Sequence, residues 1–252
     1  NYYNNPKLEN ILEGYEYSLC KCLKCSGIFQ KSIPDNQFSE YIYNKLISQE
    51  DSFKKKQINK SKNDLQYLND SKIIKKLFNK DNREIKILEF GCGWGFWSIF
   101  MKSRNFNVQT CEISDSRIEF LNKNKIKNFE KLDLINEKFD FIFSDQVIEH
   151  IPEPYESLKD LSNLLKVGGY MLHRFPSSLL LKLKLKKNYV PNKDCAHPLE
   201  HINIYNKKCL LNIAEKLNLK KHNTYLLKEL NIKQRLSFLK NEFLFTTILL
   251  KK

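Results

Sequence analysis

The sequence predicts a doubly wound α/β fold, with a mostly parallel sheet of seven strands behind an N-terminal helical and irregular cap. Three observations support this. From residue 85 onward, short apolar runs alternate with segments of helical periodicity. Five of the seven glycines gather at two turns. The chain has 252 residues, 41% of them hydrophobic, which is enough for one large core. No apolar run approaches the ~20 residues of a membrane span, so we expect none.

The N-terminal part divides into two stretches. Residues 1–35 are rich in Tyr and Asn and contain a cluster of cysteines, and we expect an irregular arm there. Residues 36–80 carry apolar side chains at helical spacing, for example Leu65 and Leu68, which predicts a helical cap.

Residues 81–252 carry the alternation of strands and helices. Strands are expected at 85–90, 107–112, 129–134, 139–144, 170–175, 219–227 and 243–251. Helices are expected at 95–103, 116–122, 154–165 and 207–217. The segment 176–205 interrupts the alternation after the fifth strand. Because α/β proteins bind ligands beyond the carboxyl ends of their strands, we expect this insertion to cover a substrate, with Lys182, Lys184 and Lys186 on one face of an extended segment.

A glycine-rich loop follows the first strand of this domain. The strand 85–90 runs into Gly91-Cys92-Gly93-Trp94-Gly95 and then into a helix. Glycines permit a tight turn and close approach of a ligand to the backbone, and the helix N-terminus offers free N–H groups. The spacing G-x-G-x-G differs from the G-x-G-x-x-G of dinucleotide sites. Glu112 ends the next strand, where a carboxylate can accept hydrogen bonds from ribose hydroxyls; taken alone, it would be an exposed strand-end charge.

Five motifs occur in order over about residues 80–252. They are LEFGCGWG (88–95), Glu112, LDL (132–134), FDFIFS with VIEHIP (139–144 and 147–152) and LLKVGGY (164–170). Together they resemble the class I S-adenosylmethionine-dependent methyltransferases, which have a Rossmann-like fold. The resemblance implies S-adenosyl-L-methionine as methyl donor and S-adenosyl-L-homocysteine as product. It also implies a set of cofactor-binding residues: Glu89, Gly91, Cys92, Gly93, Gly95, Glu112, Ile113, Asp133, Leu134, Ser144, Asp145 and Gln146.

The chemistry of the cofactor gives these residues separate roles. We expect Glu112 to bind both ribose hydroxyls and Glu89 to lie near the ammonium group of the cofactor. Asp133 either accepts from the adenine amine or caps a turn. The residues from Ser144 to Gln146, beyond the fourth strand, are expected to flank the sulfonium.

Two of the five histidines are the candidate catalytic residues. His150 follows the fourth strand, and the stretch 201–210, which begins with His201, resembles the H-x-x-x-[FY]-[ST]-x-x-x-L segment of small-molecule and sugar methyltransferases. A hydroxyl acceptor loses a proton as it is methylated, and imidazole suits the role of general base. Structural roles remain as alternatives: His201 as a hinge that hydrogen-bonds the insertion to the domain, and His150 as a residue that orients its loop.

The predicted function is O-methylation of a small-molecule or saccharide-linked acceptor, with or without a phosphate group, in surface-polysaccharide or secondary metabolism. The net charge of +14 is compatible with an anionic acceptor or with a solvated lysine-rich surface. An RNA methyltransferase is the alternative, but only five of the 43 basic residues are Arg, and nucleic acid is not the expected partner. A non-catalytic S-adenosylmethionine-binding module is the third possibility, against which the glycine loop and Glu112 argue.

The seven cysteines are odd in number and scattered, which is not the pattern of a disulfide framework and indicates a reducing cytoplasm. Cys22 and Cys25 form a C-x-x-C knuckle. Sugar-modifying relatives in the family carry an N-terminal zinc ribbon with two such pairs, whereas this chain has one pair and Cys20. We therefore expect no metal, and zinc only if a further pair precedes Asn1.

Overall fold

The central element of the molecule is a seven-stranded sheet, seen in a computed structural model that describes residues 5–178, 181, 185, 189–190, 194–222 and 245–252. Its strand order is β5-β4-β3-β6-β7-β10-β9. The strands are β3 (Lys86–Phe90), β4 (Asn107–Cys111), β5 (Lys127–Phe129), β6 (Phe139–Asp145), β7 (Leu165–Pro176), β9 (Lys220–Lys221) and β10 (Phe245–Lys251). The strands β3 to β7 pair in parallel, while β10 runs antiparallel to both of its neighbours. The predicted seven-stranded, mostly parallel sheet is confirmed.

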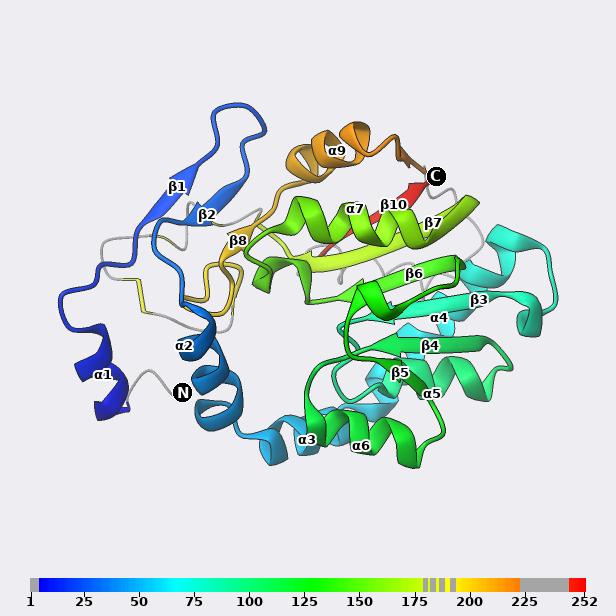
Figure 1. Cartoon of the computed structure of the whole chain (residues 1–252), viewed down its shortest axis with the longest axis horizontal. Helices are drawn as coiled ribbons and strands as arrows, with labels where there is room; N and C mark the ends of the chain where they lie inside the picture. Colours follow the sequence, from blue (N-terminus) through cyan, green and yellow to red (C-terminus); the bar gives the residue numbers. More distant parts are fainter. Residues whose placement is uncertain (1–4, 179–180, 182–184, 186–188, 191–193, 223–244) are drawn as a thin grey trace.

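Helices cover both faces of this sheet, with α7 in front of the strands and α4 behind them in Figure 1. Side chains alternate between the faces along each strand. Leu88 and Ile142 pack in a cluster with α7 (Pro154–Leu164) and α9 (Lys207–Lys216). Ile87 and Phe141 pack on the opposite face with α4 (Lys60–Phe78) and α5 (Phe96–Ser103). The remaining helix between strands, α6 (Asp115–Lys123), follows β4.

The chain before the sheet holds four helical segments between residues 36 and 78. It contains α2 (Asn36–Tyr41), a π-helical turn η2 (Ile42–Leu46), α3 (Gln49–Ile58) and α4. Among the described helices, none combines the length and apolar composition needed to cross a bilayer.

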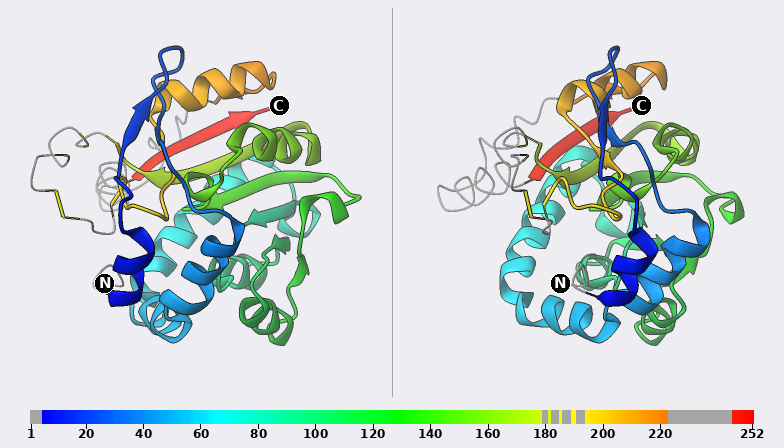
Figure 2. Two further views of the ribbon diagram at one scale, coloured as in Figure 1. Left: turned by 60° about the vertical axis from the view of Figure 1, so that its left-hand side comes forward. Right: turned by 90° about the vertical axis from the view of Figure 1, so that its left-hand side faces the viewer.

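The N-terminal arm differs from the irregular segment expected for residues 1–35. It contains α1 (Pro6–Leu12) and a hairpin of β1 (Leu19–Lys21) and β2 (Ile28–Gln30). The strand β2 also pairs with β8 (Asn203–Ile204), so a second, three-stranded sheet joins the arm to the insertion. Figure 2 shows this hairpin beside β8 and α9 at one end of the molecule. Such short strands carry too little periodicity to be found from sequence, and they depend on a partner far along the chain.

Two strand predictions need correction. The strand expected at 129–134 is instead β5, which ends at Phe129, followed by the 3₁₀ turn η4 (Leu132–Leu134). The fifth strand begins at Leu165, before the Gly168-Gly169 pair, because Leu165 pairs with Phe139 of β6 across a register shift. The end of the chain adds a bond at this glycine pair, where Lys252 N donates to Gly169 O at 3.1 Å. The remainder of the strand expected at 219–227, and the lysines at 182, 184 and 186, lie outside the described residues.

Candidate active site

Glu112 lies directly after β4, where its carboxylate is fixed against the glycine loop. Its Oε2 accepts a hydrogen bond from the amide of Gly93 at 2.7 Å. Its Oε1 accepts from the amides of Ile113 and Ser114, both at 3.1 Å, and the Arg117 guanidinium lies 3.6 Å away. Each carboxylate oxygen has two lone pairs, so Oε2 retains acceptor capacity for a ligand hydroxyl. The structure thus brings Glu112 and the glycine loop together, as predicted.

Two glycines of the loop serve different purposes. Gly91 has φ +67°, and a Cβ added there would lie 2.5 Å from Cγ2 of Val147, so the segment after β6 packs directly on this glycine. Gly93 has φ +57°, but a Cβ added there would meet no atom within 4 Å. The backbone of Gly93 therefore faces open space beside Glu112, which fits close approach of a ligand.

Two large apolar side chains are exposed next to this carboxylate. Ile113 is 77% exposed, and Leu134, in the turn after the neighbouring strand, is 56% exposed. The strands that precede Ile113 and Leu134, β4 and β5, are neighbours in the sheet, and Glu112 N donates to Phe129 O at 3.1 Å. Asp133 is exposed in the same turn as Leu134. Exposed apolar surface beside an acid that is expected to bind ribose suits an adenine ring, so these residues fit the cofactor implied by the sequence.

Glu89 is buried at the end of β3. Ser98 Oγ donates to its Oε2 at 2.5 Å, and desolvation raises its pKa to about 8. An ammonium group brought near Glu89 would favour the charged carboxylate again. Cys92 lies in the glycine loop between β3 and α5, and its thiol points to the carbonyl oxygen of Gly93 at 3.5 Å.

The three residues expected to flank the sulfonium do not share one environment. Ser144 is fully buried, and its hydroxyl lies 2.7 Å from Nδ1 of His173, so this side chain faces the core rather than a ligand. Burial lowers the pKa of His173 to about 3, which keeps this imidazole neutral. Asp145 and Gln146 are half-buried at the end of β6, and Gln146 has a positive φ of 59°.

A buried ion pair that the sequence analysis did not single out joins the cap to the sheet. Asp70 of α4 accepts from both terminal nitrogens of Arg174, in the C-terminal part of β7, and from Nε1 of Trp97 at 2.9 Å. Arg174 also lies 4.0 Å from Asp145. The signal available in the sequence was a charged residue at the end of an otherwise apolar strand. Asp70 gave no such signal within a helix rich in polar residues.

The two candidate catalytic histidines lie together, with ring centroids 4.9 Å apart. His150 Nδ1 is 2.8 Å from the carbonyl oxygen of Glu200 and 3.1 Å from the hydroxyl of Tyr43. The carbonyl of His201 accepts from Gln30 Nε2 at 3.0 Å, so the N-terminal arm helps to position it. Desolvation lowers the pKa of His150 to about 3.

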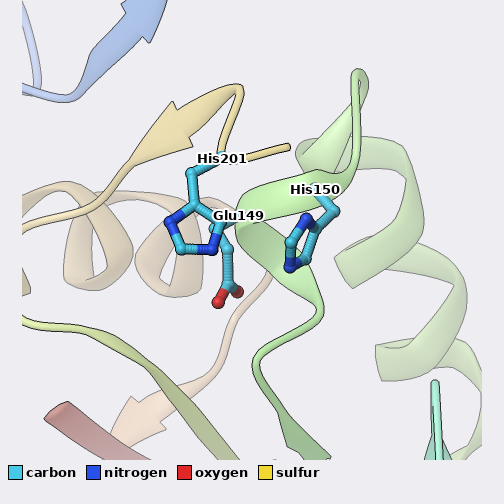
Figure 3. A group of neighbouring side chains, drawn as sticks. All are labelled: Glu149, His150 and His201. Carbon is cyan, nitrogen blue, oxygen red and sulfur yellow. The ribbon is translucent and has the colours of Figure 1, made fainter. Parts of the chain in front are cut away.

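Glu149 lies with His150 and His201 and completes their cluster, although no role was expected for it from the sequence. It precedes His150 in the 3₁₀ turn η5 (Ile148–His150) and is 1% exposed. Burial raises its pKa to about 8. Figure 3 shows its carboxylate between the two imidazole rings. Glu149 and His150 lie in the turn that follows Val147, the residue packed on Gly91, and His201 joins them from the segment before β8.

The cysteine knuckle meets a third thiol from the other end of the chain. Cys25 Sγ lies 3.5 Å from Sγ of Cys209 in α9. Asn206 caps α9 by accepting from the amide of Cys209 at 2.9 Å. Amide hydrogen bonds from Cys25 and Lys24 lower the pKa of Cys22.

Comparison with known proteins agrees with this geometry. A family described as "Methyltransferase domain" matches residues 62–224, and the chain belongs to this family. The ubiquinone biosynthesis O-methyltransferase of Nitrosomonas europaea is 25% identical over 112 residues, which are 38% of this chain and 48% of that protein. The probable S-adenosyl-L-methionine-dependent methyltransferase TehB of Haemophilus influenzae is 31% identical over 103 residues, 34% of either protein. The chain thus spans less than half the length of these curated relatives.

Solved structures show the same fold at low sequence identity. The plantazolicin methyltransferase BamL, crystallised with a triazolic desmethylPZN analog and SAH, has a TM-score of 0.61 at 12% identity and covers 85% of this chain and 94% of its own. An S-adenosylmethionine-dependent methyltransferase from Clostridium acetobutylicum has a TM-score of 0.52 at 13% identity, with coverage of 85% and 96%. The resemblance to class I S-adenosylmethionine-dependent methyltransferases is confirmed.

Proposed function

We propose that this protein is an S-adenosylmethionine-dependent methyltransferase that methylates a hydroxyl group of a small-molecule acceptor. The observation that carries the proposal is the buried Glu112 carboxylate held by the amide of Gly93 beside open backbone. Membership of the methyltransferase family supports it. The choice of oxygen as acceptor is supported by relatives that are ubiquinone biosynthesis O-methyltransferases.

The cofactor supplies an electrophilic methyl group carried on a sulfonium. In this proposal Glu112 accepts from the ribose hydroxyls, and the backbone at Gly91 and Gly93 allows close approach. Ile113 and Leu134 offer apolar surface to the adenine, because both are exposed at adjacent strand ends. Methyl transfer is an in-line displacement, so holding donor and acceptor in line supplies much of the rate.

The acceptor hydroxyl must also lose its proton. We place this step at the cluster of Glu149, His150 and His201. Two of these residues lie in η5, directly after Val147, which packs on Gly91. In this proposal His201 is the proton acceptor. His150, whose Nδ1 is bonded to the Glu200 carbonyl, orients the acceptor. The acceptor class is a small or saccharide-linked hydroxyl compound, with an anionic group as a further possibility that the charge of +14 favours.

Three measurements test the proposal. Calorimetry should detect S-adenosylhomocysteine binding to the full chain. Methyl-labelled S-adenosylmethionine, incubated with panels of phenols, nucleotide sugars and amines, should then label a hydroxyl compound. His201→Asn should lower kcat by about 10²- to 10⁴-fold and leave S-adenosylhomocysteine affinity nearly unchanged. Label recovered only in amines or RNA would refute the acceptor assignment, and absence of S-adenosylhomocysteine binding would refute the function.

A further inference from the structure

Three side chains at the acceptor end of the site form a compact set of potential metal ligands. One ligand atom from each of Glu149, His150 and His201 lies within 4.8 Å of the other two. Two of these residues are adjacent in η5, and the third comes from the segment just before β8, so the set exists only in the folded chain. Both imidazoles lie beside the carboxylate (Figure 3).

Glu149 has an electrostatic reason to hold a cation. It is 1% exposed, and neither carboxylate oxygen accepts a hydrogen bond from another of the described residues. A buried carboxylate without such partners is unfavourable in its charged form. A bound cation removes this penalty by coordinating oxygens that the protein itself leaves unsatisfied.

The protonation of His150 is also set for metal binding. Its Nδ1 lies 2.8 Å from the carbonyl oxygen of Glu200. A carbonyl can only accept a hydrogen bond, so Nδ1 carries the proton and Nε2 retains the lone pair. A metal-binding histidine commonly donates its other ring nitrogen to a carbonyl or carboxylate, which fixes the tautomer and the ring orientation. The hydrogen bond from Gln30 to the His201 carbonyl likewise fixes the backbone of the third residue.

We propose that Glu149, His150 and His201 bind a divalent cation of the zinc type. Two imidazoles and one carboxylate form a borderline donor set that suits Zn²⁺ and, among other first-row metals, Co²⁺ and Mn²⁺. Metal–ligand bonds of about 2.0–2.2 Å place tetrahedral ligand atoms roughly 3.3–3.5 Å apart, so side-chain movements on the order of 1 Å would close the set. Three protein ligands leave a fourth position for a substrate or water, as in catalytic zinc sites.

The role of the cation rests on the proposed function, although its binding does not. A divalent cation beside the acceptor hydroxyl acts as a Lewis acid and lowers the pKa of that hydroxyl. The O–H proton then passes to water, and the O–CH₃ bond forms as the S–CH₃ bond breaks. With the cation bound, His201 is a ligand rather than a proton acceptor. The metal-free and metal-bound proteins therefore deprotonate the same oxygen in two different ways.

Metal binding can be measured without turnover. The full chain is treated with a chelator, then titrated with Zn²⁺ by calorimetry and with Co²⁺ by visible absorption. We use a Cys22→Ser/Cys25→Ser background, so that the cysteine knuckle contributes no thiolate ligand. One equivalent should bind, and the Co²⁺ spectrum should lack sulfur-to-metal charge transfer. Glu149→Gln and His201→Asn should each weaken Zn²⁺ binding at least about tenfold, the scale on which even outer-shell partners act.

The matched control is His222→Asn. His222 is a histidine at the far edge of the sheet that packs on Tyr170, so its replacement should leave Zn²⁺ affinity unchanged. Circular dichroism checks the folding of each variant, and His201→Asn serves if the more buried Glu149→Gln does not fold. Failure of the background protein to bind Zn²⁺ would overturn the site. Zn²⁺ binding by Glu149→Gln and His201→Asn that is as tight as that of the background protein would overturn it as well. S-adenosylhomocysteine binding separates the two proposals: if it persists without Zn²⁺ binding, only the metal site fails.

Discussion

Replacing Glu112 with Gln tests the cofactor site with the smallest change of shape. The wild-type carboxylate accepts three amide hydrogen bonds, at 2.7 Å from Gly93 and at 3.1 Å from Ile113 and Ser114. A glutamine offers one oxygen and one NH₂ group, and NH₂ cannot accept. In either orientation of the amide, at least one backbone donor faces another donor. The variant therefore loses a charge-assisted contact of the glycine loop as well as the charge itself.

The expected magnitude follows from these contacts. A hydrogen bond to a charged group contributes about 1.5–3 kcal/mol, and neutral bonds contribute about 1 kcal/mol. If the variant loses the hydrogen bond that a ribose hydroxyl donates to the carboxylate, S-adenosylhomocysteine binding should weaken by about 1–3 kcal/mol. At 1.4 kcal/mol per tenfold change, this raises Kd about 5- to 140-fold.

Calorimetric titration with S-adenosylhomocysteine gives this Kd directly. The matched control is Glu119→Gln, because Glu119 is an exposed glutamate of α6 whose ion pair is with Lys123. This control should change Kd by less than about twofold, as expected of a surface pair. If a folded Glu112→Gln variant binds S-adenosylhomocysteine as tightly as the wild type, Glu112 does not belong to the cofactor site.

Three further predictions concern stability, each measured by urea unfolding. The pKa of Glu89 is raised from 4.5 to about 8 in the folded chain. The protonated Glu89 therefore contributes its full stability below about pH 4.5, and this contribution to the free energy of unfolding is lost as the pH rises to about 8. Glu89→Gln should remove this decline of at most about 5 kcal/mol, and an unchanged pH dependence would exclude Glu89 as its source. Asp70→Asn removes the nearer charged partner of the buried Arg174 guanidinium, leaves only Asp145 at 4.0 Å, and should cost about 3–5 kcal/mol. Asp81→Asn, in an exposed pair with Arg83, should cost less than about 1 kcal/mol, and equal losses would show that burial of the Asp70 pair does not matter. Gly91→Ala should be about 1–3 kcal/mol more destabilising than Gly93→Ala, because only at Gly91 does a Cβ meet Val147; equal effects would show that this contact relaxes freely.

Local signals account for the part of the fold that the sequence predicts. The glycine loop, the acid after the next strand and the apolar run FDFIFS each act within a few residues, through backbone conformation or burial. They predict the parallel sheet and the position of Glu112 beside the glycine loop. Where a signal was weak, as at 129–134, a short 3₁₀ turn was mistaken for a strand.

The remaining features depend on contacts between distant segments, which no local pattern encodes. The hairpin of the N-terminal arm is stabilised by pairing with β8, and Asp70 is paired with Arg174 across 104 positions. The sequence by itself determined the fold class, the glycine loop and the candidate histidines. Only the tertiary structure decided that Ser144 faces the core and that Glu149 joins His150 and His201, because burial and the direction of a side chain are set by what packs against it.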